Sequence, residues 1–87
     1  DFTVINYNLS QATAQVRIKI FDSKGRLVRT LLNNQASGSN GSVIFDGLDD
    51  ENNALRMGIY IIFLEALNDN SGIVETIKSV VVVARRL

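Results

Sequence analysis

Four acidic residues cluster near the middle of the chain and are its first candidates for chemistry: Asp46, Asp49, Asp50 and Glu51. Carboxylate oxygens at short spacing are ligands that Ca²⁺ prefers. Their spacing departs from that of a helix-loop-helix calcium loop, however, and Asp side chains also cap backbone amides in tight turns. The turn interpretation is favoured over a calcium site, and no cofactor is expected.

The groups that the common hydrolase mechanisms need are missing. The sequence contains no histidine and no cysteine, which excludes His-based acid-base relays, Ser-His-Asp triads and Cys/His zinc sites. The carboxylate pair Asp46 and Glu65 would suit glycoside hydrolysis only in a deep cleft, which a domain of this size does not offer. The glycine-rich segment 37–41 lacks the lysine and the helix of a phosphate loop. We therefore expect no enzymatic activity.

The charge balance argues against several classes of partner. Nine basic and nine acidic residues cancel, so no strong field attracts nucleic acid. Basic residues between Arg17 and Arg29 gather on one predicted hairpin, where a solvated face is favoured and contact with an anionic glycan is the alternative. The longest apolar run, residues 80–84, is far shorter than the roughly 20 residues of a membrane-spanning helix. Neither a nucleic-acid partner nor a membrane-spanning segment is expected.

Alternation of apolar and polar residues at a period of two predicts β-strands along most of the chain. In the clearest example, Val16, Ile18 and Ile20 alternate with Arg17 and Lys19. We expect strands at residues 2–9, 14–21, 26–32, 43–45, 58–67 and 73–85. Six or seven strands in 87 residues predict one all-β domain, residues 1–87, built from two packed antiparallel sheets.

Polar and glycine-rich segments predict the connections between these strands. Asp22 to Gly25 and Asn68 to Gly72 have the composition of hairpin turns. Residues 33–42 are expected to form a loop, and residues 46–56 a polar loop with apolar anchors at Leu48 and Leu55.

Two apolar segments require a position in the sheets. Residues 58–67 are apolar on both faces, as expected for a central strand. Residues 79–84 allow two interpretations: ordinary core between sheet neighbours, which is favoured, or a surface partly offered to a partner. Proline is absent from the sequence, so no proline protects a sheet edge.

Five segments, in order, resemble one known family: Ile5–Ser10, Val16–Leu31, Phe45–Asp49, Leu55–Tyr60 and Lys78–Arg85. The family is the immunoglobulin-like domain of the flagellar hook-capping protein. The same pattern is similar to the C-terminal sorting domains of cargo of the bacterial type IX secretion system. The resemblance implies an immunoglobulin-like antiparallel β-sandwich of six to seven strands.

The resemblance also implies structural roles for particular residues. Phe45, where the family usually has Trp, and Tyr60 are expected to be core anchors. Gly25, Asp46 and Gly47 are expected to shape turns, and Gly58 to allow close backbone approach. Asn52 or Asn53 takes the place of a family glycine, and Asn tolerates positive φ best among the other residues.

For function, the leading expectation is a non-catalytic C-terminal module of a longer protein, secreted or at the cell surface and exported through the periplasm. Secretion or anchoring apparatus proteins would read its last strand through Lys78, Val80, Val82 and Arg85; domains of the parent protein are the other expected partners. The alternatives are a structural domain of flagellar hook assembly and a carbohydrate- or protein-binding adhesion module.

Overall fold

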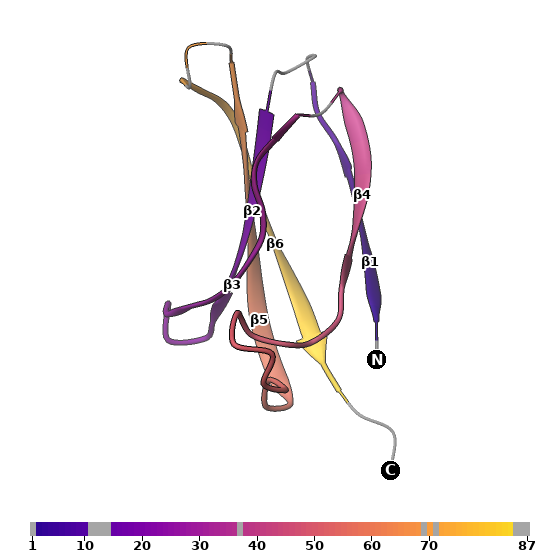
Figure 1. The fold of residues 1–87 in the computed structure, drawn as a ribbon, viewed down its shortest axis with the longest axis vertical. Coiled ribbons are helices and arrows are strands. Elements are labelled where there is room, and N and C mark those ends of the chain that lie inside the picture. Colours follow the sequence, from indigo (N-terminus) through magenta and orange to yellow (C-terminus); the bar gives the residue numbers. More distant parts are fainter. Residues whose placement is uncertain (1, 11–14, 37, 69, 71, 85–87) are drawn as a thin grey trace.

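The described residues of the protein form six antiparallel strands. A computed structural model describes residues 2–10, 15–36, 38–68, 70 and 72–84. The strands are β1 (Thr3–Asn8), β2 (Gln15–Asp22), β3 (Leu27–Ala36), β4 (Asn40–Phe45), β5 (Gly58–Leu67) and β6 (Ile73–Val83). β1 pairs with β4, and the other four strands form a second sheet in the order β3-β2-β5-β6 (Figure 1). The predicted all-β antiparallel sandwich is confirmed.

The core lies between the two sheets and follows from the period-two pattern. Val16, Ile18 and Ile20 on β2 are completely buried, and every second residue of β5 from Tyr60 to Ala66 is buried with them. Phe45, at the end of β4, brings the largest fully buried side chain into this core. Each buried aliphatic or aromatic side chain contributes about 1.5–3 kcal/mol to folding, so alternation on the two central strands determines which face of the sheet turns inward. The described part of the chain holds no helix of the length and apolarity that crossing a membrane requires.

The second face of the four-stranded sheet is not covered by any other strand of the described residues. β5 is a central strand as predicted, but its outward residues are only partly covered: Ile61 and Phe63 are half-buried and Ile59 is exposed. The Phe63 ring meets the Phe21 ring edge to face, with centroids 6.4 Å apart. Apolar sequence on both faces of this strand therefore does not correspond to burial on both faces.

The predicted loop over residues 33–42 is wrong at both ends. β3 continues to Ala36, and β4 begins at Asn40. Gln35 and Ala36 pair with the start of β2, and Asn40 pairs with Asn8 of β1. Composition indicated a loop because these side chains are polar or small. Backbone pairing with distant strands nevertheless extends β3 in one sheet and β4 in the other through these residues.

The position favoured for residues 79–84 is also wrong. β6 is an edge strand rather than a strand between two sheet neighbours. Val80 and Val82 are 63% and 62% exposed, while Val81 and Val83 pack against the core. The order of strands in a sheet depends on long-range pairing, which local hydrophobicity does not specify. Ala14 and Arg85, at the ends of two predicted strands, lie outside the described residues.

Candidate functional site

The acidic segment is organised by a hairpin turn around Asp49. Its Oδ1 accepts hydrogen bonds from the amides of Glu51 (2.8 Å) and Asn53 (2.9 Å), and its own amide donates to the Asn53 carbonyl (2.9 Å). Asn52 adopts φ 65°, and it is one of the two asparagines, Asn52 and Asn53, expected to replace a family glycine. The turn is closed by a bridge between Leu48 and Ala54.

The same arrangement of bonds recurs at two other turns. Asp22 Oδ1 accepts from the amides of Lys24 and Arg26, both at 2.9 Å, and Gly25 has φ 84°. Asn68 Oδ1 accepts from the amides of Asn70 (3.0 Å) and Gly72 (2.8 Å). In each turn one Asp or Asn oxygen satisfies the amides two and four residues later, a local role that needs no ligand.

Arg29 joins β3 to the segment that follows β4. Its Nη1 donates to Asp46 Oδ1 at 2.9 Å and to the Leu48 carbonyl at 2.8 Å. Asp46 Oδ1 also accepts from the Leu48 amide at 3.1 Å. Partial burial raises the pKa of the Asp46 carboxyl, but the Leu48 amide and the positive charge of Arg29 outweigh this effect and hold the pKa below its usual value.

Asp50 ties the same segment to the edge of β3. Its amide donates to the Val28 carbonyl (3.0 Å), and its Oδ1 accepts from the Thr30 amide (3.0 Å). Glu51 is exposed. Across the described residues, no group of three or more acidic, His or Cys side chains is placed to hold a metal ion. The oxygens of Asp46, Asp49 and Asp50 instead accept bonds from backbone amides.

The carboxylate pair considered for glycoside hydrolysis is divided between two arginines. Asp46 binds Arg29 after β4, whereas Glu65 binds Arg17 Nε at 2.7 Å across the β2–β5 pair. Arg17 and Glu65 are direct partners in the register of these strands. Each carboxylate is thus engaged in a separate ion pair on a different part of the sandwich.

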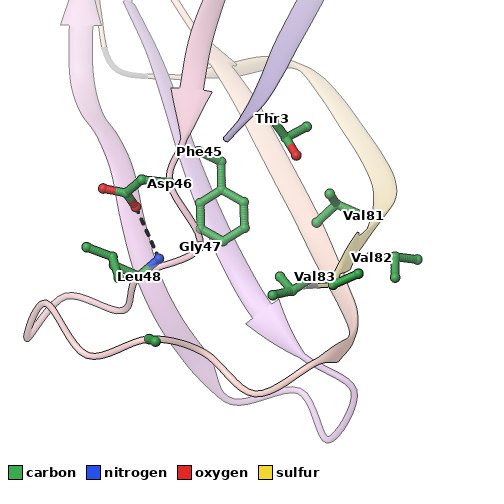
Figure 2. A pocket seen from close by; sticks show the side chains of 10 residues that line it. Thr3, Phe45, Asp46, Gly47, Leu48, Val81, Val82 and Val83 are labelled. Carbon is green, nitrogen blue, oxygen red and sulfur yellow. Dashed lines mark hydrogen bonds between the residues drawn. The ribbon is translucent and has the colours of Figure 1, made fainter. Parts of the chain in front are cut away.

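A pocket of about 330 Å³ opens at the seam between the two sheets, where β6 ends. It is lined by Thr3 of β1, by residues 45–48, by Ala54 and by residues 81–84. Figure 2 shows Val81 and Val83 on the side of the Phe45 ring, with Val82 pointing away from it. The pocket therefore brings the Phe45-Asp46-Gly47 segment together with the last strand.

Of the described residues predicted for the sorting strand, one lines this pocket and two do not. Val82 lines it, whereas Lys78 and Val80 lie farther back on β6, outside the lining. Arg85 lies outside the described residues.

The aromatic anchors lie in the core. Phe45 is 2% exposed, and Tyr60 is buried with its Oη donating to the Arg56 carbonyl at 2.8 Å. A tyrosine near the start of a strand, bonded to backbone a few residues upstream, is a hallmark of immunoglobulin-like domains. Of the six aromatic side chains, Phe2 is the one largely exposed, so few rings are available for stacking on a sugar.

The glycines behave differently from expectation at one position. A Cβ on Gly58 would meet no atom within 4 Å, so the expected close backbone approach there is wrong; its φ of 154° is what disfavours other residues. Close approach occurs at Gly41 instead, where a Cβ would lie 2.5 Å from Tyr7 Oη. Gly47 has φ 76° in the turn that follows Phe45.

The sequence did not predict the bonds of Arg29, because the basic residues of its hairpin favoured a solvated face, with contact with an anionic glycan as the alternative. The available signal was a break in alternation: Val28, Leu31 and Leu32 all pack on the core, which a regular strand does not allow. β3 pairs with β2 through several register shifts. Such irregularities change the face to which successive side chains point, so neighbouring apolar residues of β3 can pack on the core while Arg29 bonds the segment after β4.

Two packed antiparallel sheets with this tyrosine define an immunoglobulin-like domain. Residues 3–70 match the FlgD Ig-like domain family. The match spans most of the chain, from the start of β1 through β5, and the protein belongs to this family of structural domains. β6 lies beyond the matched residues. No curated protein and no solved structure matches the chain.

Proposed function

We propose that this domain is a non-catalytic structural module of flagellar hook assembly, exported through the periplasm to pack within a capping oligomer. The observation that carries the proposal is the family match over residues 3–70, which includes the turn built by Phe45, Asp46 and Gly47. The contacts described above support a structural role, because the polar side chains of that turn bind backbone and Arg29. Such a module acts through its shape and surface.

A domain exchange tests this function. In a bacterium whose hooks fail when the immunoglobulin-like domain of the hook-capping protein is deleted, that domain is replaced by residues 1–87. We expect the chimera to restore hook growth and motility. A chimera that is stable and exported but indistinguishable from the deletion would contradict hook assembly. A chimera carrying Phe45→Ala serves as the control for a poorly folded insert.

Sorting by a type IX secretion apparatus is the second candidate, favoured by one observation. β6 is an accessible edge strand that carries Lys78, Val80 and Val82 on its exposed side. A reporter fused ahead of residues 1–87 in a type IX-competent bacterium is expected to reach the surface. Substitutions Val80→Thr and Val82→Thr, made together at exposed positions, are expected to reduce export without unfolding the domain. A reporter held in the periplasm by the unaltered domain would rule this role out.

A further inference from the structure

The outer edge of β6 is long, regular and open. β6 is hydrogen-bonded to β5 on one side, and within the described residues no strand pairs with its other side. The pairing from Gly58 with Val83 to Ala66 with Glu75 contains no register shift. An unprotected edge of this kind presents a row of free backbone donors and acceptors, which is a template for another strand.

Only part of this edge is accessible along the seam. At the beginning of β6, Glu75 Oε1 accepts hydrogen bonds from the amide and hydroxyl of Ser10, both at 2.9 Å, so the region just after β1 is tied to it. At the other end of β6, residues 81–83 line the pocket together with Thr3 of β1. The accessible stretch therefore runs from Lys78 to Val83.

The pocket supplies a place for an inward side chain of an added strand. Side chains of neighbouring strands in one sheet point alternately to the same two faces. A strand beside β6 would turn a residue level with Val81 toward the pocket and the Phe45 ring, while residues level with Val80 and Val82 would cover those exposed valines. Both faces of the added strand thus gain apolar contact.

Charge complementarity specifies the next position. Phe63 is paired with Lys19 on one side and with Lys78 on the other. In the described part of the chain, the ion pairs involve neither lysine. These two lysines lie on either side of Phe63 in the register of the sheet. A carboxylate opposite Lys78 would complement it.

We propose that β6 binds an extended segment of another polypeptide as a fifth strand of the four-stranded sheet. The segment runs antiparallel to β6, the more stable arrangement and that of every other strand pair in the domain. It carries apolar residues opposite Val82, Val81 and Val80, any residue opposite Ser79, and an acidic residue opposite Lys78. This binding site does not depend on hook assembly.

A peptide titration tests the proposal on the full 87-residue chain. The probe is a soluble peptide with the consecutive residues valine, isoleucine, valine, threonine and glutamate, flanked by polar residues. We expect saturable changes in the amide NMR signals of residues 78–83, with slowed hydrogen exchange there. A peptide N-methylated at alternate residues cannot form the ladder, and its binding is expected to be at least tenfold weaker.

A charge exchange tests the register. Lys78→Glu is expected to weaken binding of the glutamate peptide about threefold and to strengthen binding of a matched lysine peptide by a similar factor. Lys24→Glu makes the same charge change in a distant turn and should alter neither affinity. Three outcomes would overturn the proposal: no saturable change on β6, changes centred on another strand, or dimerisation of the chain through β6 that excludes the peptide.

Discussion

The two edges of the four-stranded sheet are treated in opposite ways. The β3 edge is covered by the segment after β4, through the bonds of Asp50 to Val28 and Thr30 and of Arg29 to Asp46. Among the described residues, the β6 edge is contacted by Ser10 at Glu75 but has no such cover from Lys78 to Val83, where Val80 and Val82 are exposed. Since folded proteins normally protect sheet edges against unwanted pairing, the difference supports the proposed binding of an added strand at β6.

The largest effect on stability is expected from Phe45, whose ring is part of the core and lines the pocket beside β6. Phe45→Ala removes a side chain that is 2% exposed and should lower the free energy of unfolding by about 3–5 kcal/mol, a large part of what a domain this small possesses. Urea denaturation measures the loss. The neighbouring Ile44, which is largely exposed, provides the control: Ile44→Ala should change stability by less than about 0.5 kcal/mol. Equal losses for Phe45→Ala and Ile44→Ala would show that the Phe45 ring, which lines the pocket, does not contribute to the core.

Removing the Arg29 side chain should loosen the segment after β4 from the edge of β3. Arg29→Ala deletes the bonds to Asp46 and Leu48, and because these groups are partly solvated we expect a loss of about 1 kcal/mol. Hydrogen exchange at the Thr30 amide should accelerate more than exchange at the centre of β5. Arg26→Ala, which breaks an exposed ion pair with Asp22, should leave Thr30 exchange unchanged. If both variants behave alike, Arg29 does not hold the cover in place.

Low pH should weaken the bond between Arg29 and Asp46, which helps to cover the β3 edge. The folded-state pKa of Asp46 lies below its ordinary value of 3.8, so its contribution to stability is present above that value and is lost as the pH falls through the lower, folded-state pKa. The pKa of Asp22 is lowered in the same direction, chiefly by the hydrogen bond from the Arg26 amide. Denaturation midpoints measured below about pH 5 should fall less steeply for Asp46→Asn than for the unaltered chain. An unchanged slope would assign the acid sensitivity to Asp22 and the remaining carboxylates.

The smallest effect on stability is expected at the open edge. Val82→Thr, at an exposed position, should change the free energy of unfolding by less than about 0.5 kcal/mol, whereas Val81→Thr places a hydroxyl against the core and should cost about 1 kcal/mol. Thermal unfolding compares the two. The double variant Val80→Thr and Val82→Thr should also raise the concentration at which the chain begins to associate. Equal costs at positions 81 and 82 would contradict the alternation of β6.

Sequence patterns predicted the elements whose causes are local. Alternation of Val16, Ile18 and Ile20 with charged residues identified β2 and its buried face, because burial of one side of a strand leaves a period of two. The preference of Asn for positive φ correctly predicted Asn52 as one of two residues replacing a family glycine. Both features depend on a few neighbouring residues.

The features that sequence patterns did not predict depend on contacts between residues that are distant in the sequence. Whether β6 has one sheet neighbour or two follows from the order of strands, and its apolar sequence suits either position. The extension of β3 to Ala36 depends on pairing with the start of β2, and Arg29 bonds Asp46 and Leu48, which lie 17 and 19 residues away. The pairing of β3 with β2 leaves no pattern within one segment, and the contacts of Arg29 leave only the break in alternation at Leu31 and Leu32.

The turns at Asp22, Asp49 and Asn68 have a consequence for how this domain can vary. Each is closed by hydrogen bonds among five successive residues, and the Asp49 turn is in addition bonded to β3 through Asp50. The turns at Asp22 and Asn68 can therefore vary in sequence as long as the residue that accepts these bonds is kept, whereas the Asp49 turn must also keep Asp50 against Val28 and Thr30. Change can accumulate at these hairpin ends while the sandwich stays the same.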